Sequence, residues 1–82
     1  MAELARFYGI VVWLIGGDQS PPHIHASYSG DEGYFDIYTG AQLKGSMKGK
    51  SVQLVAEWIG IHRLELLKMW ETQEFRKLDP LP

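Results

Sequence analysis

Apolar and polar positions follow the pattern of short strands in the first half of the chain and a helical period in the second half. The run Phe7–Ile15 is dense in β-branched and aromatic residues and predicts a strand with apolar side chains on both faces. After a loop rich in glycine and proline, His23–Tyr28 and Tyr34–Tyr38 predict two further strands joined at the turn Ser29–Gly33. Gln42–Met47 predicts a short fourth strand or an extended connection.

The second half predicts one long helix from about Ser51 to Phe75, because this stretch contains no proline and Ser51 is a suitable N-cap. The apolar stripe that should cover the sheet consists of Val52, Val55, Ala56, Ile59, Leu66, Leu67 and Trp70. Leu54, Trp58 and Ile61 lie off that stripe. A domain with a single helix cannot easily cover a second apolar face itself, so we expect these three residues to contact a second copy of the chain or a small protein partner.

Together these elements predict an α+β fold, in which a small antiparallel sheet of three to four strands packs against one long C-terminal α-helix. The chain of 82 residues suits a single domain over residues 1–82, with its core from about residue 6 to residue 75. The tail, residues 77–82, contains two prolines and is expected to fray.

Composition and charge narrow the classes of function. A hydrophobic content of 45% is enough for a packed core, and a net charge of −2 argues against generic nucleic-acid binding, although Lys44, Lys48 and Lys50 form a local basic cluster. The absence of cysteine excludes disulfides and thiolate metal sites. No secretory leader is recognised, and the longest apolar run is far below the roughly 20 residues of a membrane helix. We therefore expect a cytoplasmic protein without a membrane span.

The segment Ser20–Ala26 carries the most informative chemistry. His23 and His25 follow two prolines, and side chains two positions apart in a strand point to the same face. Imidazole is a common acid–base group near neutral pH and a favoured metal ligand. A divalent metal such as Zn²⁺ would need a third protein ligand, for which His62 is the remaining histidine. The oxygen alternatives are Asp18, Asp31 and Asp36.

Three interpretations of the histidines stay open at this point. In the first, His23, His25 and His62 are catalytic or metal-ligating residues of a small hydrolase such as an RNase. In the second, the pair His23 and His25 forms a polar site without a metal. In the third, all three are structural, with His62 packed and donating one hydrogen bond. No glycine-rich phosphate loop, cysteine nucleophile or nucleophile elbow is present. The sequence therefore identifies no cofactor beyond the divalent metal considered above.

The register of the hairpin after the second predicted strand decides which face the histidine pair occupies. A three-residue turn at residues 30–32 pairs His25 with Ile37 and directs the pair to the face that the helix covers. A two-residue turn at residues 30–31 pairs His25 with Asp36 and directs the pair to the tyrosine-rich face, away from the helix. The sequence leaves both registers open.

Two motifs together cover the chain from about residue 7 to residue 70. The first consists of Phe7-x-Gly9-Ile10, Asp18 and Pro21-Pro22-His23-x-His25-Ala26-x-Tyr28. The second is Trp58-x-x-x-His62-Arg63-x-Glu65-Leu66-Leu67-x-x-Trp70. Both resemble the bacterial family known as domain of unknown function 4160, which implies a compact domain in which His23, His25 and His62 are recurrent residues. Members of that family are often encoded beside another small domain of unknown function, number 2442, in loci that resemble toxin–antitoxin pairs.

From this resemblance and the surplus apolar helix face, we expect a protein-interaction component of a toxin–antitoxin-like module. The alternatives are a small histidine-dependent hydrolase, metal-assisted or not, and a domain whose histidines are purely structural. Whether the protein is an enzyme is left open by the sequence.

Overall fold

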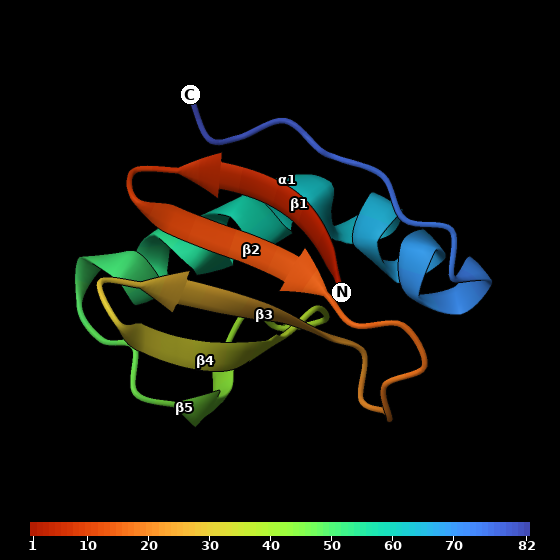
Figure 1. Ribbon diagram of the computed structural model, residues 1–82, viewed down its shortest axis with the longest axis horizontal. Coiled ribbons are helices and arrows are strands. Elements are labelled where there is room, and N and C mark those ends of the chain that lie inside the picture. The colour runs from red at the N-terminus through yellow and green to blue at the C-terminus, as the bar shows by residue number, and fades with distance from the viewer.

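The computed structural model describes residues 1–82 and shows one helix packed across one face of an antiparallel sheet (Figure 1). The strands are β1 (Ala2–Phe7), β2 (Ile10–Leu14), β3 (His23–Tyr28), β4 (Asp31–Asp36) and β5 (Gln42–Gly45), and the helix is α1 (Lys50–Thr72). Neighbouring strands in the sheet are also consecutive in the chain. The α+β class with a single helix on an antiparallel sheet is confirmed, but the sheet has five strands and the expected three to four is wrong.

The additional strand is β1, which arises because the apolar run Phe7–Ile15 is interrupted by a turn. Tyr8 and Gly9 have φ angles of 52° and 80°, and two successive left-handed residues close the tightest hairpin between antiparallel strands. Phe7 therefore pairs with Ile10 directly across the turn. Tyrosine rarely adopts a positive φ, so the residue types at this turn carry no clear hairpin signal.

The hairpin between β3 and β4 turns one residue earlier than either predicted register. Its turn residues are Ser29 and Gly30, with φ angles of 51° and 89°, and they pair His25 with Tyr34. The histidine pair consequently lies on the face of the sheet opposite to the one that α1 covers, as the two-residue alternative predicted. On the opposite face of these strands, Ile24, Ala26 and Phe35 are fully buried.

The helix is shorter than predicted at its C-terminal end. It stops at Thr72 instead of Phe75, because Gln73 adopts the left-handed conformation, with a φ of 61°, that terminates many helices. At the other end the N-cap is Gly49 and not the predicted Ser51, which is buried inside the first turn.

The buried face of α1 is rotated relative to the predicted stripe. Its buried residues are Ser51, Val55, Trp58, Ile59, His62, Leu66 and Met69. Val52, Leu67 and Trp70 belong to the predicted stripe but are only partly buried. No helix in the structure combines the length and the apolar character that crossing a membrane requires.

The tail, residues 77–82, which the sequence predicts to fray, packs beside β1 in the structure (Figure 1). The N–H of Leu78 donates a hydrogen bond of 2.9 Å to the carbonyl of Leu4, in the exposed edge of β1. Leu78 and Leu81 are 7% and 9% exposed. Burial of two leucines offsets the conformational entropy lost when the tail is ordered.

Candidate functional site

Three polar side chains converge on the outer face of the sheet, at the start of β3. His23 and His25 are two positions apart on this strand, so the pleat directs both rings to the same side. The loop between β2 and β3 folds back and places Asp18 against both rings. Oδ2 of Asp18 lies 3.0 Å from Nε2 of His23 and 3.2 Å from Nε2 of His25. We call these three residues the Asp–His–His cluster.

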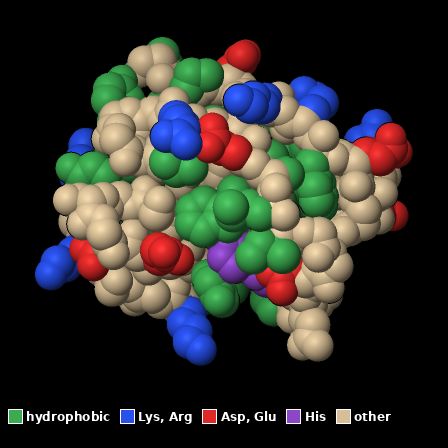
Figure 2. Space-filling view, viewed as in Figure 1, with side chains coloured by type: hydrophobic (Ala, Val, Ile, Leu, Met, Phe, Trp, Pro, Cys, Tyr) green, Lys and Arg blue, Asp and Glu red, His purple; other side chains and the backbone are tan.

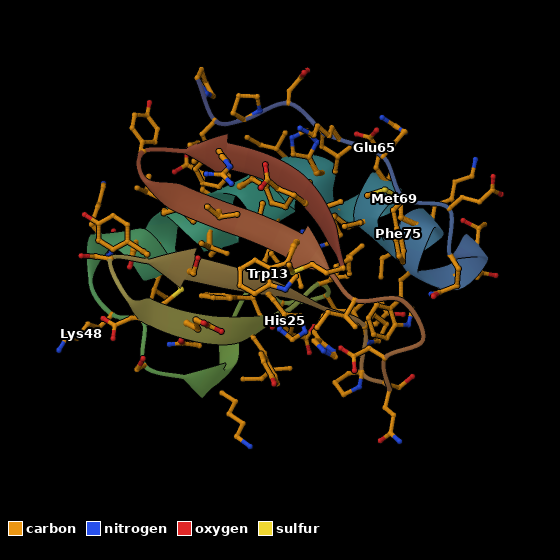
Figure 3. All side chains as sticks on the ribbon, in the orientation of Figure 1. Trp13, His25, Lys48, Glu65, Met69 and Phe75 are labelled. Atoms are coloured by element: carbon orange, nitrogen blue, oxygen red, sulfur yellow. The ribbon has the colours of Figure 1, made fainter.

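Aromatic rings enclose the two imidazoles of this cluster. Trp13 on β2 stacks on His25 with 5.6 Å between ring centroids, Tyr34 on β4 contacts both histidines, and Trp70 on α1 contacts His23. Figure 2 shows histidine surface between apolar side chains on this face, and Figure 3 shows Trp13 next to His25. The histidines are therefore buried, and the cluster reaches solvent mainly through its carboxylate.

The hydrogen-bond partners of the cluster indicate which of its atoms carry protons. Nδ1 of His23 lies 2.8 Å from the carbonyl oxygen of Pro21, and because a carbonyl only accepts, this nitrogen donates. The hydrogen bond from His25 holds the pKa of Asp18 below its ordinary value. The charge and the hydrogen bond of His23 act in the same direction, whereas burial opposes them. The carboxylate is thus kept in its charged form.

Of the predicted oxygen alternatives, the structure brings only Asp18 to the histidine pair. Asp31 accepts a hydrogen bond from a serine hydroxyl at the sheet edge. Asp36 accepts two hydrogen bonds from backbone N–H groups of the turn that follows β4. Asp36 therefore stabilises a local turn, whereas Asp31 connects the start of β4 to the segment after β5.

The third predicted site residue, His62, lies apart from the pair and has different partners. Its Nε2 and the Nε1 of Trp58 both donate to the carbonyl of Asp79 in the tail, at 2.9 Å each. Its Nδ1 lies 3.4 Å from a carboxylate oxygen of Glu65, and the hydrogen bond from His62, followed by that from Arg76, lowers the pKa of Glu65. The structure does not bring the three histidines together, and His62 fastens the tail to α1.

The three residues predicted to form an interaction surface have separate environments. Only Ile61 projects into solvent, with 60% of its surface exposed. Trp58 is fully buried and stacks on Phe7 with 5.8 Å between ring centroids. Leu64, which was not predicted, is 82% exposed and follows Ile61 by one helical turn. A spacing of three residues places Leu64 on the same helix face as Ile61, and this spacing is the sequence signal that could have added it to the predicted surface.

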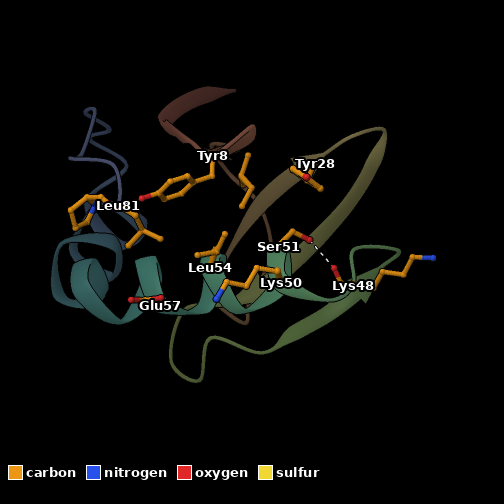
Figure 4. A pocket seen from close by; sticks show the side chains of 10 residues that line it. Tyr8, Tyr28, Lys48, Lys50, Ser51, Leu54, Glu57 and Leu81 are labelled. Atoms are coloured by element: carbon orange, nitrogen blue, oxygen red, sulfur yellow. Dashed lines mark hydrogen bonds between the residues drawn. The ribbon is translucent and has the colours of Figure 1, made fainter.

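Leu54, the remaining member of that predicted surface, borders a pocket of about 550 Å³ (Figure 4). The pocket lies between the β1–β2 turn, the first turns of α1 and the tail. Tyr8, Leu54 and Leu81 line it, together with Lys50 at its rim. The side chain of Leu54 is therefore partly covered by the chain itself.

Comparison with known proteins identifies one family. The model of the family described as Domain of unknown function (DUF4160) matches residues 9–71, which include the Asp–His–His cluster and nearly all of α1. No curated protein and no solved structure matches the chain.

Proposed function

The chain belongs to the family Domain of unknown function (DUF4160), and from this premise we propose that it is a protein-interaction component of a toxin–antitoxin-like module. The interaction surface is the outer face of α1, defined by Glu57, Gly60, Ile61, Leu64 and Lys68. The resemblance of its motifs to those of the family supports the proposed setting, and the exposed apolar side chains of α1 support the choice of surface.

The observation that carries the proposal is the apolar centre of this face. Ile61 and Leu64 are 60% and 82% exposed, and neighbouring exposed apolar side chains typically mark a contact surface. Gly60 lies beside them, and a Cβ atom at this position would meet nothing within 4 Å. A glycine inside a helix costs about 1 kcal/mol relative to alanine. Since no contact within the chain requires this glycine, the close approach of a second backbone is the physical reason for it that we favour.

The partner that this face fits is a second copy of the chain. In an antiparallel pair of α1 helices, Ile61 of one copy would lie opposite Leu64 of the other, and the same midpoint places Glu57 opposite Lys68. A two-fold interface requires this reciprocity, because each contact between two different residues occurs twice, once on each side of the axis. Neither Glu57 nor Lys68 forms an ion pair within the chain, so both charges are free for this contact.

Replacing Leu64 by lysine is expected to abolish this association, because it introduces two additional positive charges at the centre of a small apolar contact. Light scattering at a few hundred micromolar should give about twice 9.3 kDa for the wild-type chain and 9.3 kDa for Leu64→Lys. The matched control is Leu43→Lys on β5, where the leucine is 49% exposed but lies outside α1, and it should dimerise like the wild type. A monomeric wild-type chain, or a Leu64→Lys variant of unchanged mass, would contradict the proposal.

A second candidate function is a small hydrolase that uses His23 and His25 with Asp18. It is supported by the convergence of the three side chains, since two imidazoles and a carboxylate can divide proton donation and acceptance between them. RNA cleavage by the wild-type chain that is lost in His25→Ala and retained in His62→Gln would support this candidate. Absence of cleavage by the wild-type chain would exclude it for RNA.

A further inference from the structure

We propose that the Asp–His–His cluster is a binding site for one divalent transition-metal ion of the Zn²⁺ class. The cluster lies on the outer face of the sheet, whereas the proposed contact between copies lies on the outer face of α1. The two proposals therefore rest on different surfaces and can fail separately.

The spacing of the donor atoms fits such an ion. Oδ2 of Asp18 and the two Nε2 atoms of His23 and His25 all lie within 4.8 Å of one another, with the oxygen at 3.0 and 3.2 Å from the nitrogens. Zinc binds nitrogen and oxygen at about 2.0–2.2 Å, which places neighbouring ligands of a tetrahedral site about 3.3 Å apart. The two oxygen–nitrogen distances already match this spacing to within a few tenths of an ångström. The Nε2 atoms of His23 and His25, which lie within 4.8 Å of each other, would take the same spacing by small rotations of the rings toward the ion.

The orientation of His23 is already that of a metal ligand. Its Nδ1 donates to the carbonyl of Pro21, which leaves Nε2 as the nitrogen that points to Asp18. Imidazoles that bind a metal through one nitrogen usually donate the other N–H to a carbonyl or carboxylate, because this bond fixes the ring and its tautomer. An ion at the centre of the cluster would replace the protons that now lie between the imidazoles and the carboxylate.

The surrounding rings limit how far the histidines can move. The ring centroid of His25 lies 5.6 Å from that of Trp13, which stacks on it, and 4.3 Å from that of Tyr34. Rings packed in this way lose little conformational entropy when they bind an ion, so the site is preorganised. The carboxylate, whose side chain is 31% exposed, is the ligand with the most room to adjust.

The donor set selects the class of metal. Two imidazole nitrogens and one carboxylate oxygen suit Zn²⁺ and its first-row neighbours, whereas Mg²⁺ and Ca²⁺ prefer sites made of oxygen. Three protein ligands leave a fourth position, and the exposed side of the cluster at Asp18 provides it. Sites with three protein ligands and one open position are typical of reactive zinc centres.

Isothermal titration of the full chain with ZnCl₂ tests the site. We expect one Zn²⁺ per wild-type chain and at least about 100-fold weaker binding by Asp18→Asn, because removing a ligand costs more than removing a residue that only supports one. Asp18 lies on a loop, so this variant should keep the fold. The matched control Asp31→Asn removes a carboxylate outside the cluster and should bind Zn²⁺ like the wild type.

Nitrogen NMR of the histidine side chains identifies the ligands independently of affinity. At one equivalent of Zn²⁺, the Nε2 resonances of His23 and His25 should shift, while both nitrogens of His62 should stay unchanged. The proposal is overturned if the wild-type chain takes up no stoichiometric Zn²⁺, or if Asp18→Asn binds it equally well. It is also overturned if the shifts appear at His62 instead of the pair.

Discussion

Replacing Trp58 by alanine is expected to lower the free energy of unfolding by about 3–5 kcal/mol, the range for large aromatic residues removed from a core. Trp58 is fully buried, and its ring contacts those of Phe7 and His62 at 5.8 and 5.0 Å between centroids. The variant also loses the N–H that donates to the tail carbonyl of Asp79. Since small domains have about 5–15 kcal/mol of stability, this loss should bring the chain close to unfolding.

Urea denaturation followed by circular dichroism measures this loss, and Trp58→Phe is the control. Phenylalanine keeps most of the apolar volume and removes the indole N–H, so it should cost about 1–2 kcal/mol. If Trp58→Ala cost less than 1 kcal/mol, the buried position of this α1 residue between β1 and the tail would be contradicted.

The second large effect is expected from the tail. Replacing both Leu78 and Leu81 by alanine should lower the free energy of unfolding by about 4 kcal/mol, because each substitution removes a buried leucine side chain near the surface. The substitutions should also release the tail from β1. Its hydrogen bonds to Leu4, Trp58 and His62 depend on the two leucines holding the backbone in place.

Amide hydrogen exchange of the wild-type chain gives an independent measure of tail order. The N–H of Leu78 should be protected, since it donates to a strand carbonyl, and it should exchange faster in the double variant. Exchange of this amide in the wild-type chain at the rate of an unstructured peptide would mean that the tail frays after all.

The elements with strong local patterns could be predicted from the sequence. The strand His23–Tyr28 has the predicted bounds, because two prolines precede it and a glycine turn follows it. The long helix was predicted within a few residues of its observed bounds, because the segment lacks proline and its apolar residues recur with a helical period. By contrast, β1 begins at Ala2 and ends in a turn formed by a tyrosine with positive φ, a conformation that depends on the strands it joins.

The candidate site was predictable only in part. Spacing alone places His23 and His25 on one face, but the choice of Asp18 over Asp31 and Asp36 depends on how the preceding loop folds back. The burial of Trp58 could not be predicted either, because the segment that covers it follows α1 and carries only two leucines as an apolar signal. Contacts between segments distant in the chain thus account for most of the differences.

The two proposed surfaces lie on opposite layers of the molecule. Figure 1 shows α1 packed behind the sheet. The Asp–His–His cluster lies on the uncovered face of the sheet, and Ile61 and Leu64 are exposed on α1. A dimer formed through α1 would therefore leave both clusters accessible, one on each copy. Metal binding and association are expected to be independent of each other.

The charges that flank the apolar centre of α1 give the most direct test of the proposed interaction. In the antiparallel dimer, Glu57→Lys and Lys68→Glu should each weaken association about tenfold in sedimentation equilibrium, because each creates two like-charge contacts across the interface. The double variant exchanges the two signs and should restore an affinity close to that of the wild type. Additive weakening in the double variant, or no effect of either single change, would contradict pairing through this face.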